Sequence, residues 1–165
     1  MAGLLRRQLP QIADRLKATL DKLQSPQIAD AESIDAEKWW SHLQDRYAHA
    51  AIEWRGGPLA GQPIPRALFD SVAENLLQNA LAKRQREPGL VIAASFDESG
   101  LSVTDSGSPI PSGLLQGLLH EPVASEDGLG IGLYHAARQA AELGYQLSVA
   151  ENQPGRVAFR LSLAP

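Results

Sequence analysis

Cysteine is absent from the 165 residues of this chain, and methionine occurs only once. The lack of cysteine excludes disulfide bonds and thiolate metal sites. No apolar run approaches the roughly 20 residues that a membrane-spanning helix needs, and the first residues do not resemble a signal peptide. We therefore expect a soluble, cytoplasmic segment without membrane contact of its own, while an upstream part of a longer parent protein remains free to anchor it in an inner membrane.

An excess of positive charge is also missing. The chain has 15 lysines and arginines against 19 aspartates and glutamates, for a net charge of −4. Proteins that bind nucleic acid normally present a basic face, so we do not expect nucleic acid as a partner. With 44% hydrophobic residues, the chain can bury one core of ordinary size, and one main domain is expected.

The first segment carries a narrow apolar stripe. From about Leu4 to Leu23, a seam with alternating spacings of four and three is formed by Leu5, Leu9, Ile12, Leu16 and Leu23, with Thr19 at its remaining position. This seam is typical of a coiled-coil helix and predicts a homodimer contact, with packing on the chain's own domain as the alternative. Residues 25–36 have no sustained period and are expected to form a linker. We therefore predict an N-terminal helix with linker over 1–30 and the main domain over 31–165.

Hydrophobic periodicity and turn residues predict the elements of the main domain. Helices are expected over about 39–49, 66–84 and 130–143. Strands are expected over about 50–54, 90–96, 101–104, 145–150 and 156–163. Strand pairs separated by helices predict an α+β fold, a two-layer sandwich in which helices cover one face of a mixed sheet.

Three polar residues recur every four positions on the long predicted helix. Asn75, Asn79 and Lys83 therefore share one face of it. An amide oxygen is a hard, neutral ligand that suits Mg²⁺, and a nearby ammonium would neutralise phosphate charge. The alternative is an ordinary solvated helix face.

Asp105 follows directly on a predicted strand and precedes Ser106 and Gly107. An ionised carboxylate only accepts hydrogen bonds, so it suits the exocyclic amine of adenine. Glycine at position 107 lets the backbone turn sharply against a ligand. An ordinary turn aspartate is the alternative.

Gly128, Gly130 and Gly132 open the last predicted helix. Backbone amides at a helix N-terminus form an anion site that phosphate oxygens can approach when no side chain intervenes. A dinucleotide-binding fold is disfavoured because no strand immediately precedes these glycines. A flexible hinge is the other alternative.

Together these segments resemble known motifs. Residues 74–80 (ENLLQNA), 105–107 (DSG) and 128–133 (GLGIGL) are similar to the N box and the two glycine boxes of the ATPase superfamily shared by gyrase, heat-shock chaperones, mismatch-repair ATPases and sensor histidine kinases. Residues 119–123 (LHEPV) resemble the motif that precedes the second glycine box in histidine kinases. The similarity covers about 39–163 and implies a Bergerat-type ATP-binding fold. Residues 1–30 resemble the second helix of the dimerisation hairpin.

The resemblance assigns a role to each matching residue. It implies that Asn79 is the Mg²⁺ ligand, that Asp105 reads adenine and that Gly107 supports the turn. The cofactor-binding cradle would consist of Gly128, Gly130, Gly132 and Leu133. Hydrolysing members of the superfamily carry a glutamate where this chain has Asn75, so the resemblance favours a kinase, with Asn75 and Lys83 as catalytic candidates.

The chain departs from the motifs at several positions, one of which is Leu119, where phenylalanine is common. Pro109 stands where the first glycine box usually has a second glycine, and Ala82 where a basic residue is common, with Lys83 displaced by one position. No phosphoacceptor box surrounds any of the histidines, which are His42, His49, His120 and His135. We therefore expect the nucleophilic histidine to lie outside this chain.

The resulting hypothesis is the catalytic portion of a two-component sensor histidine kinase. It would use ATP and Mg²⁺ and pass the γ-phosphoryl to the acceptor-histidine segment of its parent kinase, which in turn serves a response regulator. The alternatives are a protein serine kinase of the anti-sigma or switch type and a degenerate nucleotide-binding module without catalysis.

Overall fold

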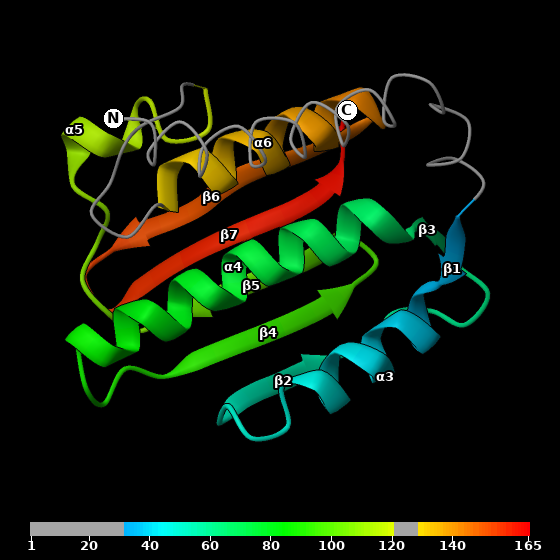
Figure 1. Cartoon of the computed structure of the whole chain (residues 1–165), viewed down its shortest axis with the longest axis horizontal. Coiled ribbons are helices and arrows are strands. Elements are labelled where there is room, and N and C mark those ends of the chain that lie inside the picture. The colour runs from blue at the N-terminus through cyan, green and yellow to red at the C-terminus, as the bar shows by residue number, and fades with distance from the viewer. Residues whose placement is uncertain (1–31, 121–128) are drawn as a thin grey trace, which may run out of the picture. The chain divides into compact units, whose positions relative to one another are not determined.

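The computed structural model describes residues 32–120 and 129–165 (Figure 1). The chain divides into two compact units, Met1–Ser33 and Ile34–Pro165. The helix predicted over 1–30 and the glycine at position 128 lie outside the described residues, as does most of the 119–123 motif.

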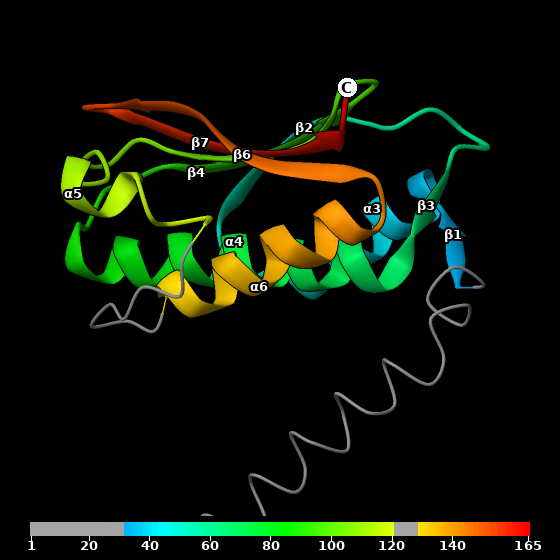
Figure 2. The same ribbon diagram turned by 90° about the horizontal axis from the view of Figure 1, so that it is seen from above.

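The second unit is built on a mixed sheet of five strands in the order β2-β4-β5-β7-β6. The strands are β2 (Ile52–Gly56), β4 (Ile92–Asp97), β5 (Gly100–Asp105), β6 (Tyr145–Gln153) and β7 (Arg156–Leu163). β2 runs parallel to β4, and the remaining neighbours are antiparallel. The long helices α3 (Ala36–Arg46), α4 (Arg66–Arg86) and α6 (Leu129–Glu142) cover one face of this sheet (Figure 2). The predicted two-layer α+β sandwich is confirmed.

β5 is the central strand of the sheet, and it buries alternate residues because the helices cover only one face. Leu101, Val103 and Asp105 are buried, while the residues between them are partly exposed. The hairpin from β4 to β5 depends on Gly100, which has a φ of +127°. A Cβ at this position would collide with the main-chain oxygen of Leu161 on β7, so only glycine fits.

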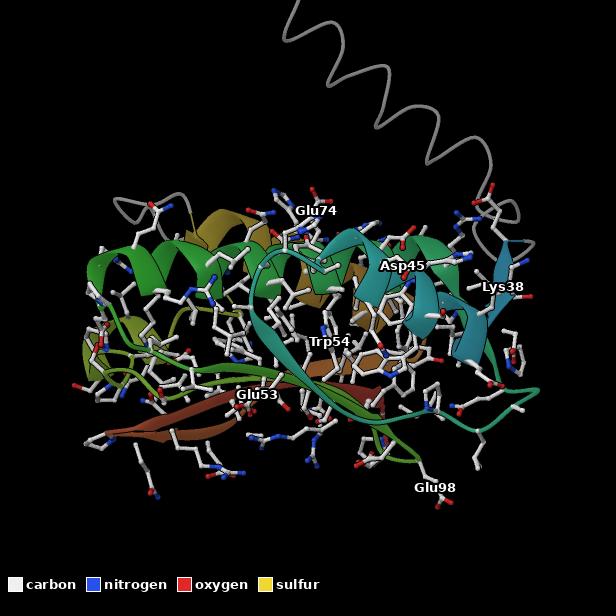
Figure 3. The ribbon with its side chains drawn as sticks, turned by 90° about the horizontal axis from the view of Figure 1, so that it is seen from below. Lys38, Asp45, Glu53, Trp54, Glu74 and Glu98 are labelled. Carbon is white, nitrogen blue, oxygen red and sulfur yellow. The ribbon has the colours of Figure 1, made fainter. Side chains whose placement is uncertain are left out.

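Aromatic rings fill the space between the helices and the sheet. Phe69 of α4 stacks on Phe96 of β4 with 5.8 Å between ring centroids. Trp39 of α3 packs edge-on against Phe69 at 5.3 Å, and Trp40 packs in the same way against Trp54 of β2 at 5.3 Å. Figure 3 shows Trp54 pointing into this layer. These large side chains, of which Trp54 is partly buried and the others are buried, anchor α3 over the edge of the sheet.

The predicted helices and strands are present, and the misses are short elements. α3 begins at Ala36, within the predicted linker, because Ala36 is fully buried and donates its amide to Gln62 O at 2.8 Å. The prediction of a linker up to residue 36 was therefore wrong at its end. A separate two-stranded sheet of β1 (Ser33–Asp35) and β3 (Pro63–Pro65), and the short helix α5 (Ser112–Leu115), were not predicted.

Candidate nucleotide site

A cavity of about 580 Å³ lies between the C-terminal half of α4 and the sheet. This volume falls within the range of small-molecule sites. Its walls come from α4, β5, β7 and the segment after β5, which comprises residues 106–118. The lining side chains include Asn79, Lys83, Glu87, Asp105, Ser108, Ile110, Leu118 and Phe159. Two of the predicted site residues on α4 therefore face the same space as Asp105.

Asp105 ends β5 at the wall of this cavity and is only 7% exposed. Its Oδ1 accepts hydrogen bonds from Lys83 Nζ and from the amide of Gly107, each at 2.9 Å. Among the described residues, none donates a hydrogen bond to Oδ2. The carboxylate is therefore held through one oxygen while the other has capacity for a ligand.

Gly107 is packed so closely that a side chain has no room. A Cβ at this position would lie 2.5 Å from Leu90 Cδ1 and 2.9 Å from Lys83 Cε. Its main-chain oxygen also accepts a hydrogen bond from Gly155 N at 3.0 Å, at the turn between β6 and β7. The glycine lets the chain pass between α4 and this hairpin.

Lys83 donates to Asp105 and also to the main-chain oxygen of Ser108. From the sequence, this ammonium was expected beside phosphate. Its contacts place it instead beside Asp105, the residue predicted to bind adenine, because Lys83 is one turn beyond Asn79 on α4 and faces the end of β5.

Glu87 fastens the segment after β5 to the end of α4. It accepts hydrogen bonds from the Ser108 amide at 2.9 Å and from the Ser108 hydroxyl at 2.7 Å. The hydroxyl bond is the main reason that the pKa of Glu87 lies below its usual 4.5, with the amide bond second and nearby Lys83 contributing. Glu87 was not predicted from the sequence. A signal was available, because a carboxylate just past a helix C-terminus opposes the helix dipole and therefore needs another reason to be there.

Asn152 holds the same segment from the sheet side. Its Oδ1 accepts the Ile110 amide at 2.7 Å, and its Nδ2 donates to the Ile110 carbonyl at 3.1 Å. Ile110 lies between Pro109 and Pro111, which have no amide hydrogen to donate. Asn152 was not predicted from the sequence, because 42 residues separate it from its partner.

The two asparagines of the N-box motif have different surroundings. Asn79 lines the cavity, and its Nδ2 is buried with no hydrogen-bond partner among the residues that the structure describes. Asn75 donates from Nδ2 to the Ser71 carbonyl at 2.8 Å, and its Oδ1 faces Gly132 of α6. Leu133, which was predicted to bind the cofactor, is fully buried in the hydrophobic core. Gly130 lies in the first turn of α6.

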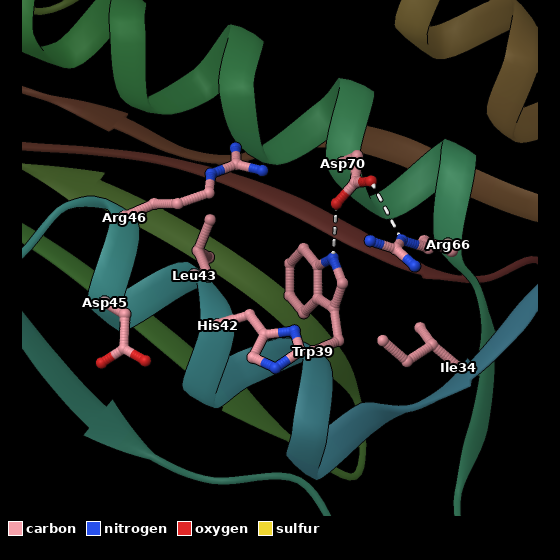
Figure 4. A pocket seen from close by; sticks show the side chains of 8 residues that line it. All are labelled: Ile34, Trp39, His42, Leu43, Asp45, Arg46, Arg66 and Asp70. Carbon is pink, nitrogen blue, oxygen red and sulfur yellow. Dashed lines mark hydrogen bonds and ion pairs between the residues drawn. The ribbon is translucent and has the colours of Figure 1, made fainter.

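A second hollow of about 330 Å³ lies between α3 and the start of α4 (Figure 4). Its central polar groups bind one another. Trp39 Nε1 donates to Asp70 Oδ1 at 2.9 Å, and Arg66 Nε lies 3.7 Å from Asp70 Oδ2. We therefore assign these groups to the packing of α3 on α4, and the larger cavity is the candidate site.

The described residues contain no group of three histidine, aspartate or glutamate side chains placed to hold a metal ion. Any Mg²⁺ in this part of the chain would depend on few protein atoms and on phosphate oxygens, which is usual for Mg²⁺ with nucleotides. None of the described helices is both long and apolar enough to cross a membrane.

Neither a family model nor a curated protein matches the sequence. Solved structures do match. The nucleotide-free catalytic domain of histidine kinase ThkA has a TM-score of 0.64 at 18% identity, over 80% of this chain and 93% of that domain. The chain has the fold of a histidine kinase catalytic domain.

Two further matches share this histidine kinase fold. Full-length ShkA in complex with AMPPNP has a TM-score of 0.60 at 21% identity, over 79% of this chain and 30% of that one. ThkA in complex with the response regulator protein TrrA has a TM-score of 0.59 at 15% identity, over 93% of this chain and 50% of that one. At these identities the likeness to histidine kinases is one of fold.

Proposed function

We propose that this chain is the ATP-binding catalytic portion of a sensor histidine kinase. The observation that carries the proposal is the buried Asp105 at the end of β5, with Oδ2 available beside a cavity of about 580 Å³. In this proposal Oδ2 accepts the exocyclic amine of adenine, since an ionised carboxylate cannot donate. The full-length kinase ShkA, which shares the fold, has been solved with the ATP analogue AMPPNP.

The Nδ2 of Asn79, which has no hydrogen-bond partner among the described residues, supports the position of the phosphates, because an N–H group can donate to a phosphate oxygen. The metal assignment rests on the resemblance of residues 74–80 to the N box. A buried polar group without a partner is costly, and native proteins retain such groups where a ligand or ion completes them. We assign Asn79 as the Mg²⁺ ligand through its carbonyl oxygen. Bound Mg²⁺ would neutralise charge on the phosphate oxygens.

We assign the remaining phosphate contacts to Gly128, Gly130 and Gly132, whose backbone amides precede or open α6. The protein then contributes mainly positioning and a favourable electrostatic environment, as phosphoryl transfer generally requires. Asn75 has a neutral amide that cannot act as a general base, which favours transfer of the phosphoryl group over its hydrolysis.

The nucleophile in this proposal is a histidine on another segment of the parent kinase. A response regulator would be the downstream partner, as in the complex of ThkA with TrrA. The segment over 1–30 would join two copies of the parent into a homodimer. Transfer to an added acceptor hairpin giving an acid-labile phosphohistidine would support a histidine kinase, whereas an acid-stable product would indicate a protein serine kinase.

The first test is calorimetric titration of the folded chain with AMPPNP, with and without Mg²⁺. We expect binding that strengthens with Mg²⁺. Asp105→Asn should weaken it by about tenfold to a hundredfold, since hydrogen bonds to charged groups contribute about 1.5–3 kcal/mol. Glu74→Gln is the control, because Glu74 is exposed on the outer side of α4 (Figure 3). No binding to a folded wild-type chain would contradict the proposal and favour a degenerate module.

A further inference from the structure

Lys83 and Asp105 form an ion pair inside the wall of the candidate nucleotide cavity. Lys83 Nζ lies 2.9 Å from Asp105 Oδ1, and the two side chains are only 14% and 9% exposed. An ion pair that is largely shielded from water interacts more strongly than one on the surface. The two side chains therefore constrain each other at the point where a base would be read.

The two oxygens of the Asp105 carboxylate have different hydrogen-bond partners. Oδ1 accepts both Lys83 Nζ and the amide of Gly107, each at 2.9 Å. Two donors on one oxygen fix the rotation of the carboxylate about its last bond. The other oxygen, Oδ2, is then presented in one orientation.

The ammonium is itself held in place. Lys83 also donates to the main-chain oxygen of Ser108, and both the amide and the hydroxyl of Ser108 bind Glu87. Lys83 lies in the last turn of α4 and Glu87 is the residue that caps this helix, so the C-terminal end of α4 binds the segment after β5 at several points. Lys83 is thereby positioned to orient Asp105.

We propose that Lys83 is a positioning residue for base recognition. It orients Asp105 so that Oδ2 accepts the exocyclic amine of a 6-aminopurine, and the preference for such a base over one without the amine therefore depends on Lys83. The inference rests on the proposed function of the cavity as an ATP site.

The test compares two nucleotides, ATP and purine riboside triphosphate, which lacks only the 6-amino group. Wild type should prefer ATP by about tenfold or more, because a hydrogen bond to a charged acceptor is lost with the amine. In Lys83→Met, this preference should fall to within about threefold, close to that of Asp105→Asn. Lys83→Arg should restore most of it, because a guanidinium also binds carboxylates well.

The ratio of the two affinities is the informative quantity. Partial unfolding lowers both apparent affinities by the same factor and leaves the ratio unchanged. Should Lys83→Met not fold at all, Lys83→Gln provides the same comparison. Arg84→Met is the matched control, because it removes a charge from the next residue, whose guanidinium binds the Ala50 and Ala51 carbonyls instead.

Different results would contradict the role of Lys83 and the proposed ATP site. If Lys83→Met weakens both triphosphates equally and keeps the preference for ATP, Lys83 acts on the phosphates or on folding, and the inference is wrong. Equal wild-type affinity for the two triphosphates would also overturn it while leaving an ATP site in place. Wild-type chain that binds neither triphosphate would overturn the proposed function itself.

Discussion

Gly132 of α6 lies directly against the side chain of Asn75 on α4. A Cβ at position 132 would collide with Asn75 Oδ1, and Asn75 is in turn held by its hydrogen bond to the Ser71 carbonyl at 2.8 Å. The helices α4 and α6 therefore meet through a glycine and a side-chain amide, close to the glycines to which we assign the phosphate contacts. This contact gives position 132 a packing role in addition to the cradle that the motif predicts.

We expect the effect of Gly132→Ala on stability to depend on residue 75. When Asn75 is present, the new methyl group forces its side chain to turn away from Ser71. The lost hydrogen bond lowers the free energy of unfolding by about 0.5–1.5 kcal/mol and offsets the higher helix propensity of alanine. In an Asn75→Ala background the collision is absent, so alanine at 132 should be more favourable by about 1 kcal/mol. Urea denaturation of wild type, the two single variants and the double variant measures this coupling. Additive effects would show that the two residues do not touch.

Replacing Asn79 with leucine should stabilise the chain while removing nucleotide binding. Within residues 32–120 and 129–165, Asn79 Nδ2 is buried without a partner, so an apolar side chain of similar size should raise the free energy of unfolding by about 1–2 kcal/mol. The Mg²⁺-dependent part of AMPPNP binding should be lost in the same variant. Gln78→Leu, on the exposed neighbouring residue, should show no such gain. A destabilised Asn79→Leu chain would mean that the amide has a structural partner.

Gly107→Ala should destabilise the chain, whereas Gly113→Ala should not. A Cβ at position 107 would lie 2.5 Å from Leu90 Cδ1 and 3.0 Å from Glu87 Oε1, and such overpacking typically costs about 1–3 kcal/mol. At Gly113 no atom lies within 4 Å of the added Cβ, so we expect a change within about 0.5 kcal/mol. Thermal and urea denaturation of both variants test the difference. Equal stability would show that the segment after β5 is not packed against α4.

The contribution of Glu87 to stability should depend on pH. The Ser108 hydroxyl bond, then the Ser108 amide bond, hold the folded pKa of Glu87 below its usual value of 4.5. A lowered carboxyl pKa means that the stabilisation is present above about pH 4.5 and is lost as pH falls through the folded pKa. Glu87→Gln should therefore be less stable than wild type at pH 7, and the difference should shrink as pH falls below 4.5.

Urea denaturation between pH 7 and pH 3 measures this difference. Ser108→Ala should reproduce most of the effect, because it removes the main cause of the shift. Glu74→Gln is the control, since no described residue donates a hydrogen bond to the Glu74 carboxylate. A difference between wild type and Glu87→Gln that stays constant with pH would contradict the assignment.

Much of the architecture follows from local patterns. The apolar face of the long helix includes Leu68, Val72 and Leu76, and the apolar and β-branched run over 101–104 predicts β5; both elements lie where expected. Gly144 ends α6 and has a φ of +80°, as a helix cap requires. These features depend on residues within a few positions of one another, so the sequence alone predicts them.

The short elements could not be predicted in the same way. Pro63 and Pro65 remove amide donors from β3, and a three-residue strand has no period to detect. α3 starts early because Ala36 is buried beneath distant residues and bonded to Gln62. Only the tertiary structure supplies those partners.

In the candidate site, too, some features follow from local sequence and others depend on long-range contacts. The sequence by itself determined the fold class and the candidates Asn79, Asp105 and Gly107, because helix spacing and turn chemistry are local. Only the tertiary structure decided that Lys83 pairs with Asp105, that Asn152 holds Ile110, and that Leu133 belongs to the core. The physical reason is that each of these contacts joins parts of the chain well separated in sequence, and that packing, which no local pattern encodes, decides which of them meet.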